Sequence, residues 1–91
     1  MSQTNVKTDD QVHLECLNRF IELANTIKDE GVDIKLVSYG LMSASGYYAT
    51  YALGGNSGGL TDSGVEKVTA TYKSELERIQ TLKKEQVSPT A

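Results

Sequence analysis

The sequence is short of the residues that usually fill a core or carry out chemistry. It has no tryptophan, and only one phenylalanine, one histidine, one cysteine and one proline. A single cysteine, Cys16, excludes an internal disulfide. His13 lies three residues before it, on the same face of a helix, but a zinc site needs three or four ligands, so the pair cannot complete one. We expect Cys16 to lie in the core and His13 at the edge of the apolar face. Pro89 lies near the end of the sequence, so no proline interrupts an earlier helix.

Basic residues are also scarce. Nine lysines and arginines against twelve acidic residues give a net charge of −3, which argues against a nucleic-acid partner. Residues 1–10 are polar and carry no apolar signal-peptide core, so we expect the protein in the cytoplasm. No charged residue lies between Lys35 and Asp62. A membrane span is nevertheless excluded, because serine, threonine, tyrosine and glycine fill too many positions and the flanks lack a basic bias.

The uncharged stretch Lys35–Leu53 is the most distinctive part of the chain. Its apolar stripe recurs at helical steps of four and three residues: Val37, Leu41, Ala44, Tyr48 and Tyr51. Small and aromatic residues fill most of the remaining circumference, which is typical of a buried helix. Gly40 and Gly46 each cost about 1 kcal/mol relative to alanine inside a helix, so we expect a neighbouring backbone to approach closely at both.

Two further helices flank this stretch. Thr8 and Gln11 have the spacing of a capping box, which predicts a helix over about 9–30. Gly31 suits the left-handed position after a helix end, and Asp33 is the expected N-cap of the second helix, over about 34–53. Ser63 and Glu66 predict a second capping box and a third helix over about 62–85. The apolar seam of this last helix is narrow, consisting of Val65, Val68, Tyr72, Leu76, Ile79 and Leu82.

The expected fold is therefore all-α. Residues 9–86 would form a single domain of three antiparallel helices around a buried, tyrosine-rich central helix, because short connections favour antiparallel neighbours. A glycine-rich loop would span 54–61, a disordered tail 1–8 and a second tail 87–91. The central helix carries more small and aromatic surface than two short neighbours can cover, so we expect a homodimer.

Three segments resemble a known family. Phe20-Ile21-Glu22-Leu23-Ala24-Asn25 resembles the end of the first helix in domain of unknown function family 3144. The family's core helix, V-S-x-x-L-M-x-A-x-x-x-aromatic, is similar to this chain from Val37-Ser38 through Leu41-Met42 and Ala44 to Tyr47-Tyr48. Its last helix, with E…Y-x-x-x-L, is similar to Glu66, Tyr72, Lys73 and Leu76.

The resemblance covers about two-thirds of the chain. It departs at Tyr47, where the family usually has an arginine, and in the glycine loop. It implies a small helical bacterial protein, found mainly in proteobacteria, and it implies no activity.

The remaining motifs give weaker evidence of a function. The GGNSGG loop lacks the lysine and the preceding strand of a phosphate-binding loop, so we interpret it as a hinge, although a glycine loop at a helix N-terminus can bind an anion. Its length would also allow the third helix to swap onto a partner chain. Asp29, Glu30 and Asp33 lack the calcium-loop spacing. The second helix lacks the basic and amide side chains of a DNA-recognition helix.

We identify no catalytic, cofactor-binding or metal-binding residues and expect no cofactor. The candidate interface or ligand surface consists of Tyr39, Gly40, Tyr47, Tyr48 and Tyr51. Two functions remain open. The first is a non-catalytic, self-associating binding or scaffold module with an unidentified protein partner. The second is a sensor of a small ligand or anion, which would use the tyrosines and serines of the central helix with the glycine loop.

Overall fold

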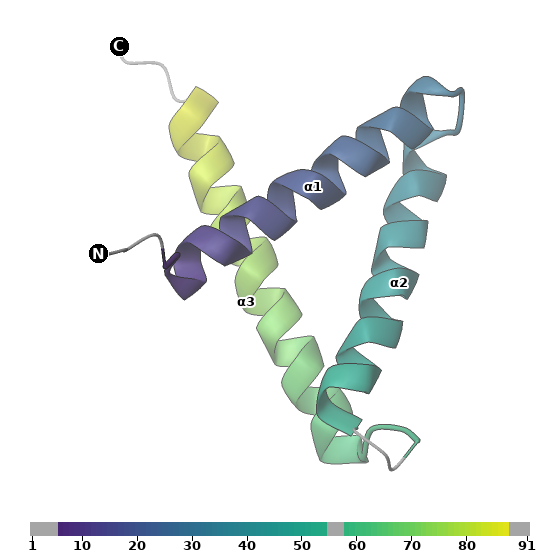
Figure 1. The fold of residues 1–91 in the computed structure, drawn as a ribbon, viewed down its shortest axis with the longest axis vertical. Helices are drawn as coiled ribbons and strands as arrows, with labels where there is room; N and C mark the ends of the chain where they lie inside the picture. Colours follow the sequence, from purple (N-terminus) through teal and green to yellow (C-terminus); the bar gives the residue numbers. More distant parts are fainter. Residues whose placement is uncertain (1–5, 55–57, 88–91) are drawn as a thin grey trace. The chain divides into compact units, whose positions relative to one another are not determined.

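The computed structural model describes residues 6–54 and 58–87, without the side chain of Val87. Within those residues the chain forms three α-helices and no strand (Figure 1). The helices are α1 (Asp9–Asp29), α2 (Ile34–Gly54) and α3 (Asp62–Val87). The prediction of an all-α chain with three helices is confirmed. Most of the two expected tails, and residues 55–57 of the glycine loop, lie outside the described residues.

The start of α1 is the predicted capping box. The Thr8 hydroxyl accepts a hydrogen bond from the Gln11 N–H at 3.1 Å, and the Gln11 side-chain carbonyl accepts one from the Thr8 N–H at 2.8 Å. Asp9 and Asp10 place negative charge at the positive end of the helix dipole. The helix ends before Gly31, whose φ of 106° lies in the region that favours glycine.

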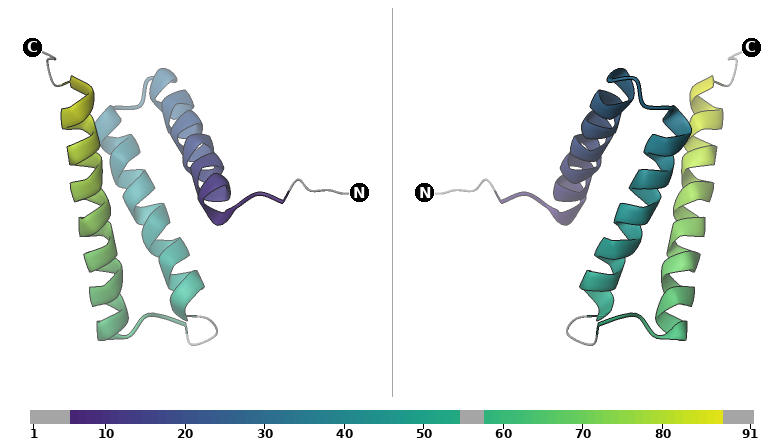
Figure 2. Two further views of the ribbon diagram at one scale, coloured as in Figure 1. Left: turned by 90° about the vertical axis from the view of Figure 1, so that its left-hand side faces the viewer. Right: turned by 90° about the vertical axis from the view of Figure 1, so that its right-hand side faces the viewer.

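The turn at residues 30–33 leads directly into α2. Asp33 is its N-cap, since its carboxylate accepts a hydrogen bond from the Lys35 N–H at 2.7 Å. The chain reverses at this turn, and the first half of α2 diverges from α1 as both leave it (Figures 1 and 2).

The start of α3 differs from the prediction. Its N-cap is Thr61, whose hydroxyl accepts a hydrogen bond from the Gly64 N–H at 3.1 Å, while its carbonyl accepts one from the Val65 N–H at 2.9 Å. Ser63 already lies inside the first turn, so the proposed box with Glu66 is wrong. Two hydroxyl residues two positions apart both fit a cap. Only the backbone path after the loop decides between them.

The chain divides into two compact units, Met1–Ser45 and Gly46–Ala91. The boundary lies within α2, so the first unit contains α1 with the first half of α2, and the second contains the other half of α2 with α3. Each unit thus brings only two helical segments together. Two paired helices can cover one strip of each other and no more, because every further face needs another element to pack against it.

Burial in the chain is correspondingly small. Ala24 is the one buried residue among those described, and no residue of α2 is buried. The expected burial of the central helix is therefore absent from the single chain. Cys16 is exposed as well, so the prediction that it lies in the core is wrong. Its position on α1 has the right helical spacing for the apolar face, but Cys16 does not line the groove that α1 forms with the first half of α2.

Candidate association surface

In the Met1–Ser45 unit, an apolar groove lies between α1 and the first half of α2. It has a volume of about 380 Å³ and no charged residue lines it. We call it the α1–α2 groove, and its lining comes from α1, the turn and α2: Phe20, Leu23, Ala24 and Ile27; Val32; Leu36, Val37, Gly40, Leu41 and Ala44. On both helices these residues recur at steps of three or four, so each helix presents one apolar face to the groove.

Small residues in the lining keep the groove open. Gly40 and Ala44 lie one turn apart on α2, and Ala24 faces them from α1. A Cβ atom built on Gly40 would meet nothing within 4 Å, and the same holds for Gly46. The close backbone approach that we expected at these glycines is therefore not made within the chain. The space beside Gly40 is available to a side chain from elsewhere.

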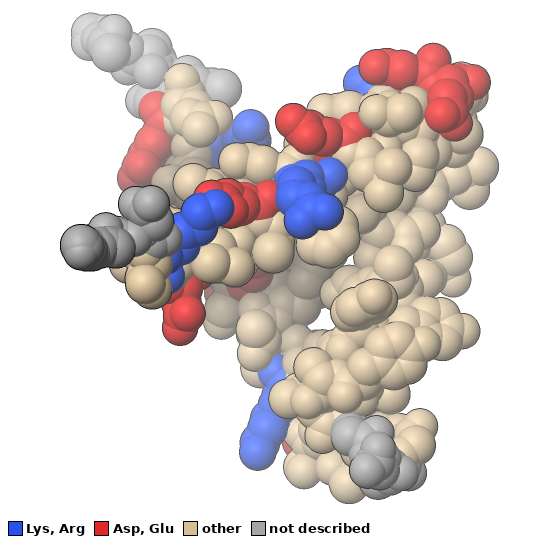
Figure 3. Space-filling view, in the orientation of Figure 1, with Lys and Arg blue, Asp and Glu red and all other residues tan. Residues whose placement is uncertain are grey.

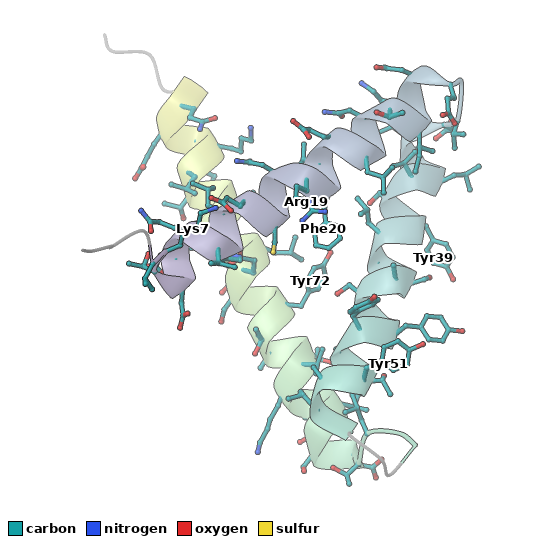
Figure 4. All side chains as sticks on the ribbon, viewed as in Figure 1. Lys7, Arg19, Phe20, Tyr39, Tyr51 and Tyr72 are labelled. Atoms are coloured by element: carbon teal, nitrogen blue, oxygen red, sulfur yellow. The ribbon has the colours of Figure 1, made fainter. Side chains whose placement is uncertain are left out.

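The larger side chains of the groove are open to solvent. Phe20 is 61% exposed, Leu36 65% and Leu23 58%. Figure 4 shows Phe20 pointing from α1 into the space between α1 and α2. Phe20 and Ala24 lie four residues apart, on one face of α1, but the sequence alone could not show that this face lacks a cover. The sequence feature that could have indicated an open groove is the run of small residues on α2 opposite Phe20 and Ala24.

Three tyrosines form an aromatic cluster on the second half of α2. The ring centroids of Tyr48 and Tyr51 are 5.5 Å apart in an edge-to-face arrangement, and those of Tyr47 and Tyr51 are 6.5 Å apart. Such pairs contribute about 0.5–1.5 kcal/mol beyond the area that they bury. All three rings nevertheless remain mostly exposed. The cluster is therefore an aromatic surface at which another molecule can pack.

The five candidate residues from the sequence do not form one site. Gly40 lies in the α1–α2 groove, whereas Tyr39 projects from the side of α2 that faces away from Phe20 (Figure 4). Tyr47, Tyr48 and Tyr51 belong to the Gly46–Ala91 unit. Residues that are adjacent in sequence are separated here, because successive residues of a helix point about 100° apart.

Charged side chains are concentrated away from α2. In the face drawn in Figure 3, acidic residues gather at the turn between α1 and α2, and α2 beyond that turn presents only uncharged residues. On α3, Arg78 donates hydrogen bonds of 3.0 and 2.7 Å to the Glu75 carboxylate, and this hydrogen bonding, with the negative charge, raises the pKa of Arg78. The Nζ atom of Lys73 lies 3.9 Å from the Oε2 atom of Glu77. These pairs are exposed and contribute little to stability.

The start of α3 borders a second, smaller concavity. Its lining includes Leu53, Leu60, Thr61, Gly64 and Lys67. The Thr61 hydroxyl already accepts the hydrogen bond from the Gly64 N–H that caps α3. The middle of the loop that was considered for anion binding, residues 55–57, falls outside what the structure describes. Anion binding at this loop therefore stays a prediction.

No metal-binding arrangement is found in the part of the chain that the structure describes, since no three histidine, cysteine, aspartate or glutamate side chains gather there to hold an ion. None of the described helices combines the length and the apolar character needed to cross a membrane.

Comparison with protein-family models, with curated proteins and with solved structures found no match to this chain. The resemblance to family 3144 therefore stays a prediction that rests on the motif residues alone.

Proposed function

We propose that the chain is a non-catalytic binding module that acts by self-association, as a homodimer. The observation that carries this proposal is the burial of Ala24 alone among the described residues. Most helical stability in proteins comes from packing of an apolar face and not from intrinsic helix propensity. Three helices that bury one alanine lack that contribution, and a second copy of the chain supplies it.

The exposed apolar side chains support the same proposal. On α2, Tyr47, Tyr48 and Tyr51 are each more than 60% exposed, and on α1 Phe20 is 61% exposed. After Lys35, no residue of α2 carries a charge. Aromatic residues are enriched, and charged residues are depleted, at the centres of protein interfaces.

In the proposed dimer, the tyrosine-rich helix α2 becomes the buried centre that the sequence leads us to expect, with antiparallel helices around it. The interface includes the α1–α2 groove and the tyrosine cluster of residues 47, 48 and 51. The cytoplasm as compartment and membership of family 3144 belong to the same proposal. No enzymatic activity is proposed.

Sedimentation equilibrium tests the proposal directly. Between about 1 and 100 μM, we expect the fitted mass to be close to twice 9.9 kDa. A Tyr48→Ala variant removes an exposed ring from the proposed interface, and Ser74→Ala on α3 is the matched control at a polar position. We expect the first to weaken association and the second to leave it unchanged. A mass of 9.9 kDa at 100 μM for the unmodified chain would show that it folds alone, and the proposal would then be wrong.

A further inference from the structure

The apolar seam of α3 is much longer than the helical segment that accompanies it in its own unit. To the Gly46–Ala91 unit, α2 contributes only residues 46–54, which span about 13 Å at 1.5 Å per residue. The 26 residues of α3 span about 39 Å, so within this unit α2 can accompany only about a third of α3. Large side chains of the seam remain open to solvent, since Tyr72 is 51% exposed, Leu76 41% and Leu82 42%.

We propose that the α3 seams of two copies pack against each other in antiparallel orientation, with a two-fold axis near Leu76. This inference rests on the proposed function, because it names a further surface through which the homodimer forms. In a two-fold interface, every contact from a residue of one copy to a residue of the other occurs a second time with the copies exchanged. The pattern of residues on α3 must therefore match itself when it is read backwards.

The apolar residues of the seam match in this way. With the axis near Leu76, the Leu76 side chains of the two copies lie beside each other. Val68 of one copy then lies beside Leu82 of the other, and Tyr72 beside Ile79, and each of these two pairs forms twice. Every seam residue from 68 to 82 thus receives an apolar neighbour.

The charged residues along one edge of the seam match as well. Glu66, Lys73, Glu77 and Lys84 follow one another at steps of seven, four and seven residues, so they lie on one side of α3. Their charges alternate in sign. In an antiparallel two-fold pair the same edge of both helices comes together, which places Glu66 beside Lys84 of the second copy and Lys73 beside Glu77. Each charge of this edge therefore meets its opposite.

This charge complementarity favours a second copy as the occupant of the seam. Charges that border an apolar seam select the partner helix and its orientation, and a reversed α3 supplies all four opposite charges at the required spacing. Glu66 and Lys84 lie 18 residues, or about 27 Å, apart along α3, so they cannot pair within one helix. The side chains of Lys73 and Glu77 are 76% and 67% exposed, so a second copy can reach them.

A matched pair of variants of the full chain tests the apolar contact. Leu76→Glu brings two carboxylates together at the axis, whereas Ser74→Glu places the same charge on the far side of α3, because residues two apart on a helix point about 200° apart. We expect Leu76→Glu to raise the dissociation constant of the dimer about tenfold or more, and Ser74→Glu to change it less than about twofold. Circular dichroism at high concentration verifies that the helices are retained.

Charge reversal decides between a second α3 and any other cover for the seam. Glu66→Lys and Lys84→Glu each place like charges side by side at two symmetric positions of a homodimer. In about 20 mM salt, where screening is weak, we expect either variant alone to have a dissociation constant raised about five- to tenfold. A mixed dimer with one chain of each variant has opposite charges at both positions, so an equimolar mixture should dimerise about as tightly as the unmodified chain.

The recovery in the mixture is specific to this pairing. Both substitutions oppose the helix dipole, but that effect is the same in the mixture as in each variant alone and cannot produce a recovery. Sedimentation equilibrium gives the mean mass of each sample. If the unmodified chain dimerises but the mixture dimerises no better than either variant, this inference is wrong while self-association stands, and the seam is covered by its own chain or by another protein. An unmodified chain that is monomeric at 100 μM would refute both proposals.

Discussion

Dilution should unfold this protein, because the described part of the single chain buries only Ala24. If folding depends on a second copy, the folded state is favoured by mass action, and its midpoint of thermal unfolding rises with chain concentration. A self-sufficient monomer unfolds at the same temperature at every concentration. The concentration dependence of the midpoint therefore measures how far the fold relies on association.

The size of this dependence follows from the unfolding enthalpy. At about 0.7 kcal/mol per residue, residues 9–87 of two chains unfold with an enthalpy of roughly 110 kcal/mol. The shift in the midpoint for a tenfold change in concentration is RTm² ln 10 divided by that enthalpy. Near 60 °C this is about 4–5 °C per tenfold change, or roughly 9 °C between 1 and 100 μM.

Helix content followed by circular dichroism at 222 nm gives the midpoint at each concentration, with cuvettes of different path length to keep the signal constant. The Ser74→Ala variant, which changes a polar position on α3, should show the same slope as the unmodified chain. A midpoint that stays within about 1 °C across the hundredfold range, together with a reversible transition, would refute the argument from exposure.

Two further substitutions test local features of the fold. Thr61→Ala should lower the free energy of unfolding by about 1 kcal/mol, or the thermal midpoint by about 4–8 °C, because it removes the N-cap of α3. Ser63→Ala should have little effect. A larger loss of stability in Ser63→Ala than in Thr61→Ala would restore the sequence-based assignment of Ser63 as the cap. Gly31→Ala should cost about 1–2 kcal/mol because φ is 106° there, whereas Gly46→Ala should add about 0.5–1 kcal/mol because that helical glycine has open space beside it. Urea denaturation at one fixed chain concentration measures both pairs, and equal effects at the two glycines would contradict the backbone geometry.

Local features of this fold follow from the sequence because they depend on residues close together in the chain. The capping box of Thr8 and Gln11, the N-cap Asp33 and the helix end at Gly31 each involve positions within a few residues of one another. Three helices with nearly the observed bounds follow from these signals and from helical periodicity. The cap of α3 is the exception, since a loop precedes it and two hydroxyl residues compete for the role.

Burial could not be predicted in the same way. Periodicity identifies apolar faces such as the stripe that contains Val37, Leu41 and Ala44, but an apolar face is buried only where another element covers it. The arrangement of the helices within each unit leaves Phe20 and Leu36 exposed, leaves open space beside Gly40 and separates Gly40 from Tyr39. The sequence by itself thus determined where the helices begin and end, through short-range hydrogen bonds and backbone preferences. Only the tertiary structure decided which apolar faces remain uncovered, because cover depends on contacts between residues far apart in the chain.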